Sequence, residues 1–185
     1  MRAKQRRGPV RYPKTMASTA IVSVREYLSA SYRPDREYID GIILERNLGE
    51  RDHSEVQTNL SSWLHSRHKE LGIWVYVEQR VQVKPSRFRV PDICVVAGPK
   101  PLEQVFTQPP LICIEILSKD DRAGEMQERI DDYLAFGVRY VWVVNPTTRR
   151  AYVHTTAGTR EAKDGVLRTE NPEIVAPLAE IFSSL

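Results

Sequence analysis

Hydrophobic and polar positions alternate along this chain in segments that predict both helices and strands. Apolar residues recur at helical spacing over residues 52–70 and over residues 122–136, and the glycines that follow, Gly72 and Gly137, are suited to ending a helix. Shorter apolar runs bounded by turn residues predict strands. These runs cover residues 74–83, 90–96, 111–117, 138–144 and 151–155.

The remaining segments complete the predicted order. Ser23 is a good N-cap for a short helix that reaches about Ser29. Asp40-Gly41, between alternating residues, predicts a hairpin, and residues 177–184 predict a short helix at the end of the chain. A further hairpin is expected before that helix. The order predicts a mixed α/β domain built around one sheet.

Length and composition are typical of one globular domain. The chain has 185 residues, of which 41% are hydrophobic and 28% charged. We expect residues 1–20 to form a basic, disordered tail and residues 21–185 to form a single domain.

The net charge of +3, from 27 basic and 24 acidic residues, is concentrated at the N-terminus. Residues 1–20 contain no acidic residue, so this segment could hold a nucleic-acid backbone by counterion release. A solvated tail without a partner explains the same pattern, as does translation that begins at Met16. The basic residues of the segment are Arg2, Lys4, Arg6, Arg7, Arg11 and Lys14.

The sequence points to the cytoplasm. No apolar stretch approaches the ~20 residues of a membrane span, and the N-terminus lacks the apolar region of a signal peptide. Cys94 and Cys113 both lie in apolar strands, which favours buried free thiols in a reducing compartment.

Two carboxylates lie in segments that are otherwise apolar. Asp92 follows Pro91 at the start of one strand, and Glu115 lies inside the strand of residues 111–117. A carboxylate is costly to bury unless a partner compensates its charge. A divalent cation such as magnesium is a partner that two carboxylates can share.

Strand parity supports a common location. Side chains alternate between the faces of a strand, so Glu115 shares its face with Cys113, and Asp92 shares its face with Cys94. If the two strands are antiparallel neighbours with Asp92 opposite Glu115, then Cys94 lies opposite Cys113. A second interpretation needs no metal: Asp92 merely follows Pro91 at a strand entry, and Glu115 meets a buried arginine.

Several motifs, taken in order, resemble a known nuclease superfamily. Pro91-Asp92, Glu115 on the next strand and a helix that leads to Tyr-x-x-x-Gly-Val resemble the PD-(D/E)xK nucleases. More narrowly, the chain resembles the Uma2 family of putative restriction endonucleases over about residues 23–182. The motifs that carry this resemblance are Glu37-Tyr-Ile-Asp-Gly41, His53, Pro91-Asp92, Ile114-Glu115-Ile-Leu-Ser118 and Tyr133-Leu-Ala-Phe-Gly-Val138.

The resemblance implies a restriction-endonuclease-like fold, in which helices flank a central mixed β-sheet. It implies a Mg²⁺- or Mn²⁺-dependent endonuclease that hydrolyses phosphodiester bonds of DNA. Asp92 and Glu115 would be metal ligands, together with the backbone carbonyl of Ile116. Oxygen ligands and waters suit these hard cations.

The sequence departs from the superfamily pattern at one position. The lysine expected two residues after the second acid is Leu117 here. The relatives often carry the base on the following helix, four residues before the tyrosine, and that position is Arg129. Arginine stays protonated, so Arg129 could clamp a phosphate but could not act as a general base. By alternation, Lys119 would lie on the same strand face as Glu115, but it comes after the expected end of the strand.

Arg129 has an alternative role in the sequence, because an ion pair with Glu125 or Asp132 on the helix surface would also explain it. The resemblance further implies that Glu37 and His53 border the metal site. Without the resemblance, the sequence favours a structural or capping role for His53. Glu37 could then face solvent from a strand edge.

Three functions are consistent with these residues. The first is a metal-dependent DNA endonuclease with Asp92, Glu115 and Arg129 in the site, and a homodimer would let two symmetric sites cut both strands. The second is a nuclease fold that lost its lysine and binds nucleic acid or a protein without cleavage. In the third, Asp92 and Glu115 are paired internally and the sheet is a scaffold.

Overall fold

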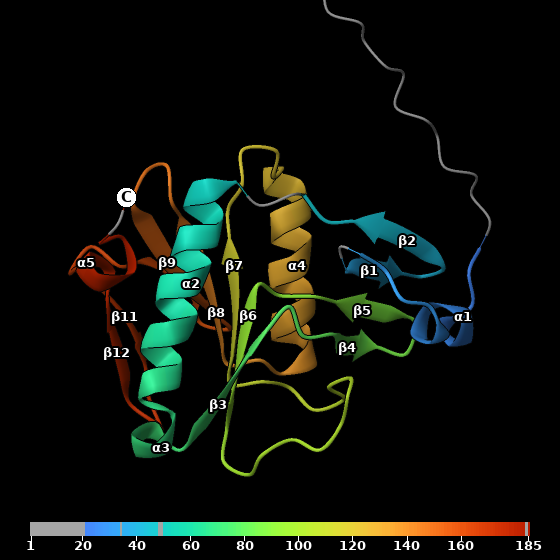
Figure 1. Cartoon of the computed structure of the whole chain (residues 1–185), viewed down its shortest axis with the longest axis horizontal. Helices are drawn as coiled ribbons and strands as arrows, with labels where there is room; N and C mark the ends of the chain where they lie inside the picture. The colour runs from blue at the N-terminus through green and yellow to red at the C-terminus, as the bar shows by residue number, and fades with distance from the viewer. Residues whose placement is uncertain (1–20, 34, 48–49, 184) are drawn as a thin grey trace, which may run out of the picture.

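The computed structural model describes residues 21–33, 35–47, 50–183 and 185. The predicted basic tail, residues 1–20, lies outside the described residues, so its division from a single domain stays a prediction. Figure 1 shows the helices and strands of the described part of the chain.

Five helices lie in the described residues: α1 (Val24–Ser29), α2 (Arg51–Ser66), α3 (His68–Leu71), α4 (Ala123–Phe136) and α5 (Leu178–Ile181). Ser23 caps α1 as predicted, because its side chain and that of Glu26 form a reciprocal capping box. The first long helix predicted from the sequence is interrupted at Arg67, which separates α2 from α3. Gly72 and Gly137 end α3 and α4 in the left-handed region, with φ of 62° and 109°. None of these helices combines the length and apolar character that crossing a bilayer requires.

Twelve strands were found in the described part: β1 (Arg36–Ile39), β2 (Ile42–Glu45), β3 (Ile73–Val77), β4 (Val81–Lys84), β5 (Arg87–Arg89), β6 (Ile93–Ala97), β7 (Ile112–Ile116), β8 (Tyr140–Asn145), β9 (Arg150–Thr155), β10 (Gly158–Glu161), β11 (Val166–Thr169) and β12 (Ile174–Pro177). The largest sheet has six strands in the order β10-β9-β8-β7-β6-β3. Its neighbours are antiparallel except for the parallel pair β7 and β8, which α4 connects. A four-stranded sheet has the order β2-β1-β5-β4, and β11 pairs with β12.

Two helices cover opposite faces of the six-stranded sheet. Figure 1 shows β6 and β7 between α2 and α4. The apolar stripe of α2, which includes Leu60, packs with Ile114 and Trp142 on one face. The stripe of α4, which includes Ile130 and Tyr133, packs on the other face with the two cysteine positions. The predicted central mixed sheet flanked by helices is therefore confirmed.

The expectation that the domain has one sheet is wrong. The apolar run of residues 74–83 divides at Glu78, whose φ of 52° interrupts the extended backbone. The first half becomes β3 of the six-stranded sheet, and the second becomes β4 of the four-stranded sheet. Helix α1 covers the smaller sheet through an aromatic cluster of Tyr27, Tyr38 and Phe88. This smaller sheet contributes Glu37 of β1, which lies beside Arg129 of α4.

Candidate active site

Asp92 and Glu115 lie next to each other at the ends of neighbouring strands. Strands β6 and β7 are antiparallel, and Cys94 is paired with Cys113, as the parity argument predicted. Continuing that register by two residues places Asp92 opposite Glu115. Each of the two acids is only 3% exposed. Their charges therefore require partners inside the protein.

Asp92 is surrounded by donors. Its Oδ1 pairs with the guanidinium of Arg46, while its Oδ2 accepts a hydrogen bond from the backbone N–H of Ile116 at 2.6 Å. The same Oδ2 lies 3.3 Å from Nε2 of His53. Burial raises the pKa of Asp92, but the contacts with His53 and Arg46 outweigh burial and leave this pKa below its ordinary value. Asp92 is therefore an anion at neutral pH.

His53 lies in the first turn of α2, where the helix N-terminus meets the end of β6. Burial lowers the pKa of the imidazole, but the nearby Asp92 carboxylate outweighs burial and raises it overall. The other ring nitrogen of His53, Nδ1, is buried and has no hydrogen-bond partner within the described residues. The structure thus places His53 beside the acidic pair, at the position that the family resemblance implied.

Glu115 is in a different electrostatic state from Asp92. Its Oε1 accepts a hydrogen bond from the Tyr133 hydroxyl at 2.6 Å, and its Oε2 lies 3.6 Å from Nη1 of Arg129. Burial raises the pKa of Glu115 to about 8. The Arg129 charge opposes this shift, and the negative charges of Asp92 and Glu37 reinforce it. Glu115 is therefore mostly protonated at neutral pH when no metal ion is bound.

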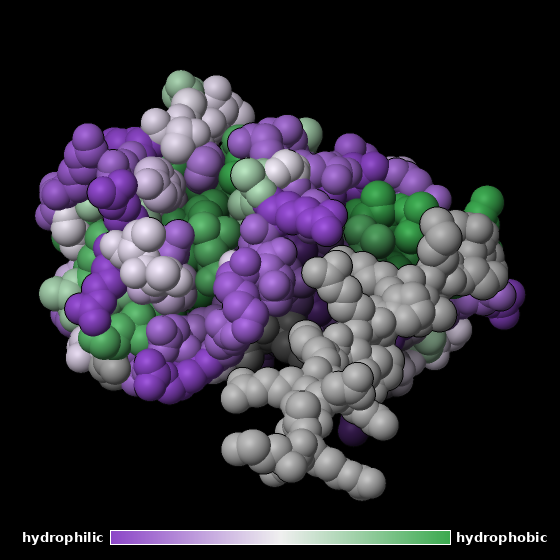
Figure 2. All heavy atoms as spheres, turned by 90° about the horizontal axis from the view of Figure 1, so that it is seen from above, coloured by the Kyte–Doolittle hydropathy of each residue, from purple (hydrophilic) through white to green (hydrophobic). Residues whose placement is uncertain are grey.

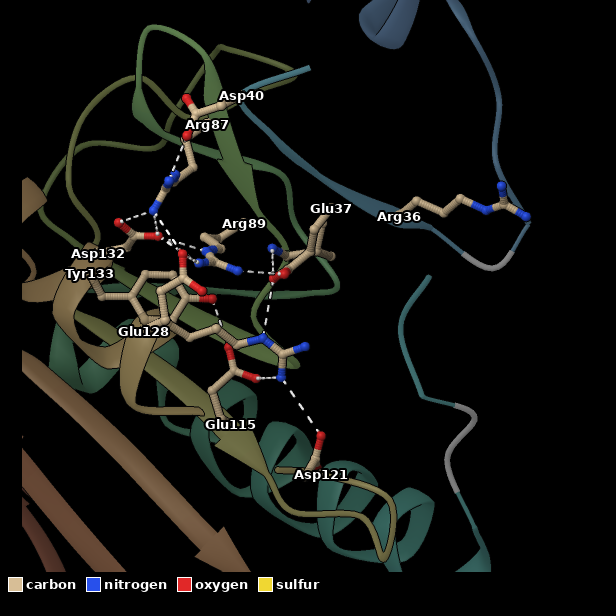
Figure 3. A network of polar contacts seen from close by, with 12 residues as sticks. Arg36, Glu37, Asp40, Arg87, Arg89, Glu115, Asp121, Glu128, Asp132 and Tyr133 are labelled. Atoms are coloured by element: carbon tan, nitrogen blue, oxygen red, sulfur yellow. Dashed lines mark hydrogen bonds and ion pairs between the residues drawn. The ribbon is translucent and has the colours of Figure 1, made fainter. Parts of the chain in front are cut away.

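Arg129 reaches from α4 into the acidic centre. Its guanidinium pairs with Glu37, Glu115 and Asp121, three acids that are labelled in Figure 3. The closest ion pairs to these three residues measure 3.5, 3.6 and 3.8 Å. Burial alone would lower the pKa of Arg129, but the surrounding carboxylates raise it further above its ordinary value, so the group remains a cation. Its contacts are with the site, not with the Glu125 or Asp132 partners that the alternative proposed.

Glu37 lies on β1 and faces the interior of the protein. Its side chain is 2% exposed, so the alternative in which it faces solvent is wrong. Glu37 Oε2 accepts a hydrogen bond from Nη1 of Arg89 at 2.8 Å, and its Oε1 lies 3.5 Å from Nε of Arg129. Glu37 therefore connects the smaller sheet with the acidic centre.

A small polar cavity opens between these groups. Its volume of about 20 Å³ can hold one species of the size of a water molecule. Asp92 and Glu115 each face an arginine here, Arg46 and Arg129 respectively. Glu115 thus meets an arginine, as the second interpretation expected, although the Arg129 side chain is 14% exposed and not fully buried. The lining residues are Arg46, Asn47, His53, Asp92, Glu115, Ile116, Ser118, Asp121 and Arg129.

The chemistry of this donor set suits a divalent cation. No cluster of three or more His, Cys, Asp or Glu side chains in the described residues is arranged to hold a metal ion alone. Mg²⁺ needs no such cage, because it is usually bound by one or two carboxylates and keeps several waters. Asp92 and Glu115 provide two carboxylates beside a cavity of the size of a water molecule. Ile116 also lines the cavity, which is consistent with a carbonyl ligand.

The two positions considered for a lysine contribute no ammonium group to the cavity. Leu117 packs with the apolar residues beneath α4. The structure places Lys119 outside the cavity lining, where its side chain is 66% exposed and pairs with Glu50. Arg46 and Arg129 are therefore the basic residues that line the cavity, together with His53.

Sequence reasoning missed three polar groups of the site. Arg46 lies between β2 and α2, far in sequence from Asp92, and no local pattern distinguishes it from other arginines. Asp121 accepts hydrogen bonds from the backbone N–H and side-chain hydroxyl of Ser118, at 2.7 and 3.1 Å. Tyr133 belongs to one of the family motifs, but the motif does not reveal the hydrogen bond from its hydroxyl to Glu115.

Figure 2 looks onto the end of the molecule where β7 leads into α4. Hydrophilic residues cover the middle of this face, and a hydrophobic patch lies toward the side of the β1–β2 hairpin. Ile42 and Leu44 of that hairpin are 53% and 41% exposed. They lie two residues apart on an edge strand of the smaller sheet, so they share a face.

Comparison with known proteins identifies similar sequences and folds. The Uma2 family model, described as "Putative restriction endonuclease", matches residues 25–182. The structure is similar to the crystal structure of a putative nuclease belonging to DUF820 from Anabaena variabilis ATCC 29413, with a TM-score of 0.77. The two chains are 23% identical, and the similarity covers 88% of this chain and 98% of that chain. At this identity the likeness shows the fold alone. No curated protein matches this chain at a significant level.

Proposed function

The chain belongs to the Uma2 family of putative restriction endonucleases, and from this premise we propose that it is a divalent-metal-dependent endonuclease that hydrolyses DNA. One observation carries the proposal: two buried acids from adjacent strands, Asp92 and Glu115, face a single polar cavity that Arg129 also lines. Hydrolysis of a phosphodiester needs charge stabilisation and an activated water, and these groups suit both needs.

Asp92, Glu115 and the Ile116 carbonyl would hold the cation, Mg²⁺ or Mn²⁺. When bound, such a cation polarises the phosphate and lowers the pKa of a water ligand. Glu115 must lose its proton before it can act as a ligand, because only the carboxylate form binds a cation. Asp92 is already ionised. Asp92 therefore provides a carboxylate before the cation binds, whereas Glu115 becomes a carboxylate when the cation binds and its proton leaves.

Arg129 and Arg46 would bind the phosphate. Both line the cavity, and a guanidinium can donate two parallel hydrogen bonds to phosphate oxygens. Arg129 contacts its three carboxylates only at 3.5–3.8 Å, so its N–H groups are not committed to short hydrogen bonds. Neither arginine can remove a proton from water. We assign them to substrate binding and to stabilising the negative charge of the transition state.

His53 would orient Asp92. Its Nε2 lies 3.3 Å from Asp92 Oδ2, while the backbone N–H of Ile116 donates to the same oxygen. Two donors on one carboxylate oxygen restrict the rotation of the Asp92 side chain. The role expected for His53 is thus to fix the ligand geometry rather than to attack the substrate.

A second candidate function is binding without cleavage. Two observations favour it: Leu117 occupies the position of the motif lysine, and an arginine already lies beside each acid. A protein of this kind would bind nucleic acid or a protein partner without a cation. Binding to DNA would then weaken steeply with salt, because phosphate contacts release counterions.

Plasmid cleavage distinguishes the two functions. We expect the parent chain to nick supercoiled DNA in Mg²⁺ or Mn²⁺, and the isosteric variants Asp92→Asn and Glu115→Gln to lose this activity. Glu125→Gln, an exposed acid on the same helix as Arg129, is the matched control and should cut like the parent. Salt-dependent DNA binding in EDTA, without cleavage in either cation, would support the second function instead.

The cellular setting completes the proposal. We propose a cytoplasmic protein that acts on DNA as a homodimer, in which two symmetric sites face the two strands. The exposed pair Ile42 and Leu44 on the edge strand β2 is a surface that a second copy could cover. Light scattering coupled to gel filtration should give twice the chain mass for the parent and the chain mass for Ile42→Lys. A parent that runs as a monomer at all concentrations would argue against the dimer.

A further inference from the structure

A line of buried charges leads from the smaller sheet to the acidic centre. Its members alternate in sign: Asp132, Arg89, Glu37 and Arg129. Figure 3 labels the first three. Asp132, Arg89 and Glu37 are 3%, 2% and 2% exposed. They come from three elements that are far apart in sequence: α4, β5 and β1. The fold thus brings together charges that could have remained in water.

The contacts within this line are directional. Nε and Nη2 of Arg89 donate to Oδ2 of Asp132 at 2.9 and 2.7 Å. The third nitrogen of the Arg89 guanidinium, Nη1, donates to Glu37 Oε2 at 2.8 Å. Arg89 therefore has little rotational freedom, because its planar guanidinium is held on both sides.

Glu37 divides its two oxygens between two arginines. Oε2 is held by Arg89, and Oε1 lies 3.5 Å from Nε of Arg129 and 3.4 Å from the backbone nitrogen of Val90. The contacts of Arg89 are short hydrogen bonds, whereas those of Arg129 are all longer than 3.4 Å. These contacts hold Glu37 in one position. Arg129 is oriented by Glu37, but its N–H groups remain available to donate hydrogen bonds to another acceptor.

We propose that Arg89 and Asp132 are positioning residues, which hold Glu37 so that Arg129 faces the cavity and can receive a phosphate oxygen. The role of Arg129 in this inference rests on the proposed function. The smaller sheet then has a role besides packing, because Glu37 of β1 and Arg89 of β5 orient Arg129 of α4. A misplacement of about 1 Å can reduce the rate of a reaction about 100-fold.

The competing explanation is a structural one, in which the charges simply join β5 to α4. Arg87 provides a matched control for that explanation. It lies two residues from Arg89 on the same strand, and it also bonds Asp132, at 3.1 Å, and Glu128, at 3.0 Å. Its ion-pair partners in the described residues are Asp40, Glu128 and Asp132, and Glu37 is not among them.

A double-mutant cycle on the single-turnover cleavage rate separates the two explanations. Arg89→Met should reduce the single-turnover rate at saturating DNA about 10-fold to 100-fold, but should have no further effect in an Arg129→Met background. Arg87→Met should stay within about twofold of the parent. Effects of Arg89→Met and Arg129→Met that multiply would overturn the inference while leaving the nuclease function intact.

A measurement without catalysis keeps the test independent of the proposed function. The heteronuclear NOE of the Arg129 Nε–Hε pair, in metal-free protein labelled with ¹⁵N-arginine, reports whether this side chain is ordered. We expect it to fall in Arg89→Met and in Glu37→Gln and to remain in Arg87→Met. The variant Glu37→Gln leaves Arg89 bonded to Asp132, so it decides the question if Arg89→Met does not fold. An unchanged NOE in a folded variant would overturn the positioning role even if the parent cuts no DNA.

Discussion

The buried carboxyl of Glu115 provides the sharpest prediction about stability. The variant Glu115→Gln keeps the size of the side chain and an oxygen that can accept the Tyr133 hydrogen bond, but it cannot ionise. In the folded parent, burial raises the pKa of Glu115 from 4.5 to about 8. The unfolded chain therefore ionises this group at a lower pH than the folded chain, and ionisation favours unfolding.

The magnitude follows from this shift. One pKa unit corresponds to about 1.4 kcal/mol, so a shift from 4.5 to about 8 corresponds to about 5 kcal/mol. Below pH 4.5 the parent and the variant should be similarly stable. Between pH 4.5 and 8 the parent should lose stability relative to the variant, and above pH 8 the difference should level off.

Urea unfolding in EDTA at a series of pH values measures the difference directly. The other charges that face Glu115, Asp92, Glu37, Arg46 and Arg129, are present in both proteins, so the difference isolates the substituted group. We expect the advantage of the variant to grow with pH, and Mn²⁺ to raise the stability of the parent more than that of the variant. Parallel stability curves without a pH-dependent gap would refute the reasoning, because they would mean that Glu115 is ionised or solvated in the folded chain.

Three further predictions concern the neighbours of this pair. Tyr133→Phe should lower the stability by about 1 kcal/mol and raise the pKa of Glu115, because it removes the hydroxyl that donates to the carboxylate. NMR titration of the carboxyl group would detect the change. An unchanged titration would show that the hydroxyl does not contact Glu115. Arg46→Met should destabilise the metal-free protein by about 3–5 kcal/mol, because it leaves the buried Asp92 carboxylate without its arginine partner. In a thermal melt, Mn²⁺ should restore much of the lost stability. A variant as stable as the parent in EDTA would contradict the pairing of Arg46 with Asp92. Burial raises the pKa of the Cys94 and Cys113 thiols, so a thiol reagent should label neither in the native state at pH 8, and rapid labelling without denaturant would be inconsistent with the fold.

The strand register of the site could be predicted from sequence, because alternation along a strand is a local property. Because side chains alternate between strand faces, Asp92 was expected on the face of Cys94 and Glu115 on the face of Cys113. The observed pairing of the two cysteines agrees with this expectation. The same logic failed at Glu78, since one left-handed residue ends a strand without changing the apolar pattern on either side. The four-stranded sheet was missed for that reason.

The partners of the acids could not be predicted, because they depend on contacts between distant segments. Arg46 meets Asp92 across 46 positions, and Arg89 meets Glu37 across 52. An arginine next to a strand looks the same in sequence whether it faces water or a buried carboxylate. The family resemblance pointed to Glu37, His53 and Arg129 as residues near the site, but only the fold shows that Glu37 bonds one arginine and lies beside another.

The measurement that tests the central claim most directly is the single-turnover rate of DNA cleavage as a function of Mn²⁺ concentration, for the parent and for Glu115→Gln. The account predicts that the parent rate rises with Mn²⁺ and saturates, whereas the variant, which lacks one of the two carboxylates, stays at the background rate or needs far more Mn²⁺. Glu125→Gln should follow the parent curve. Identical curves for the parent and Glu115→Gln would contradict the claim that the acids at the ends of β6 and β7 form a metal-dependent nuclease centre.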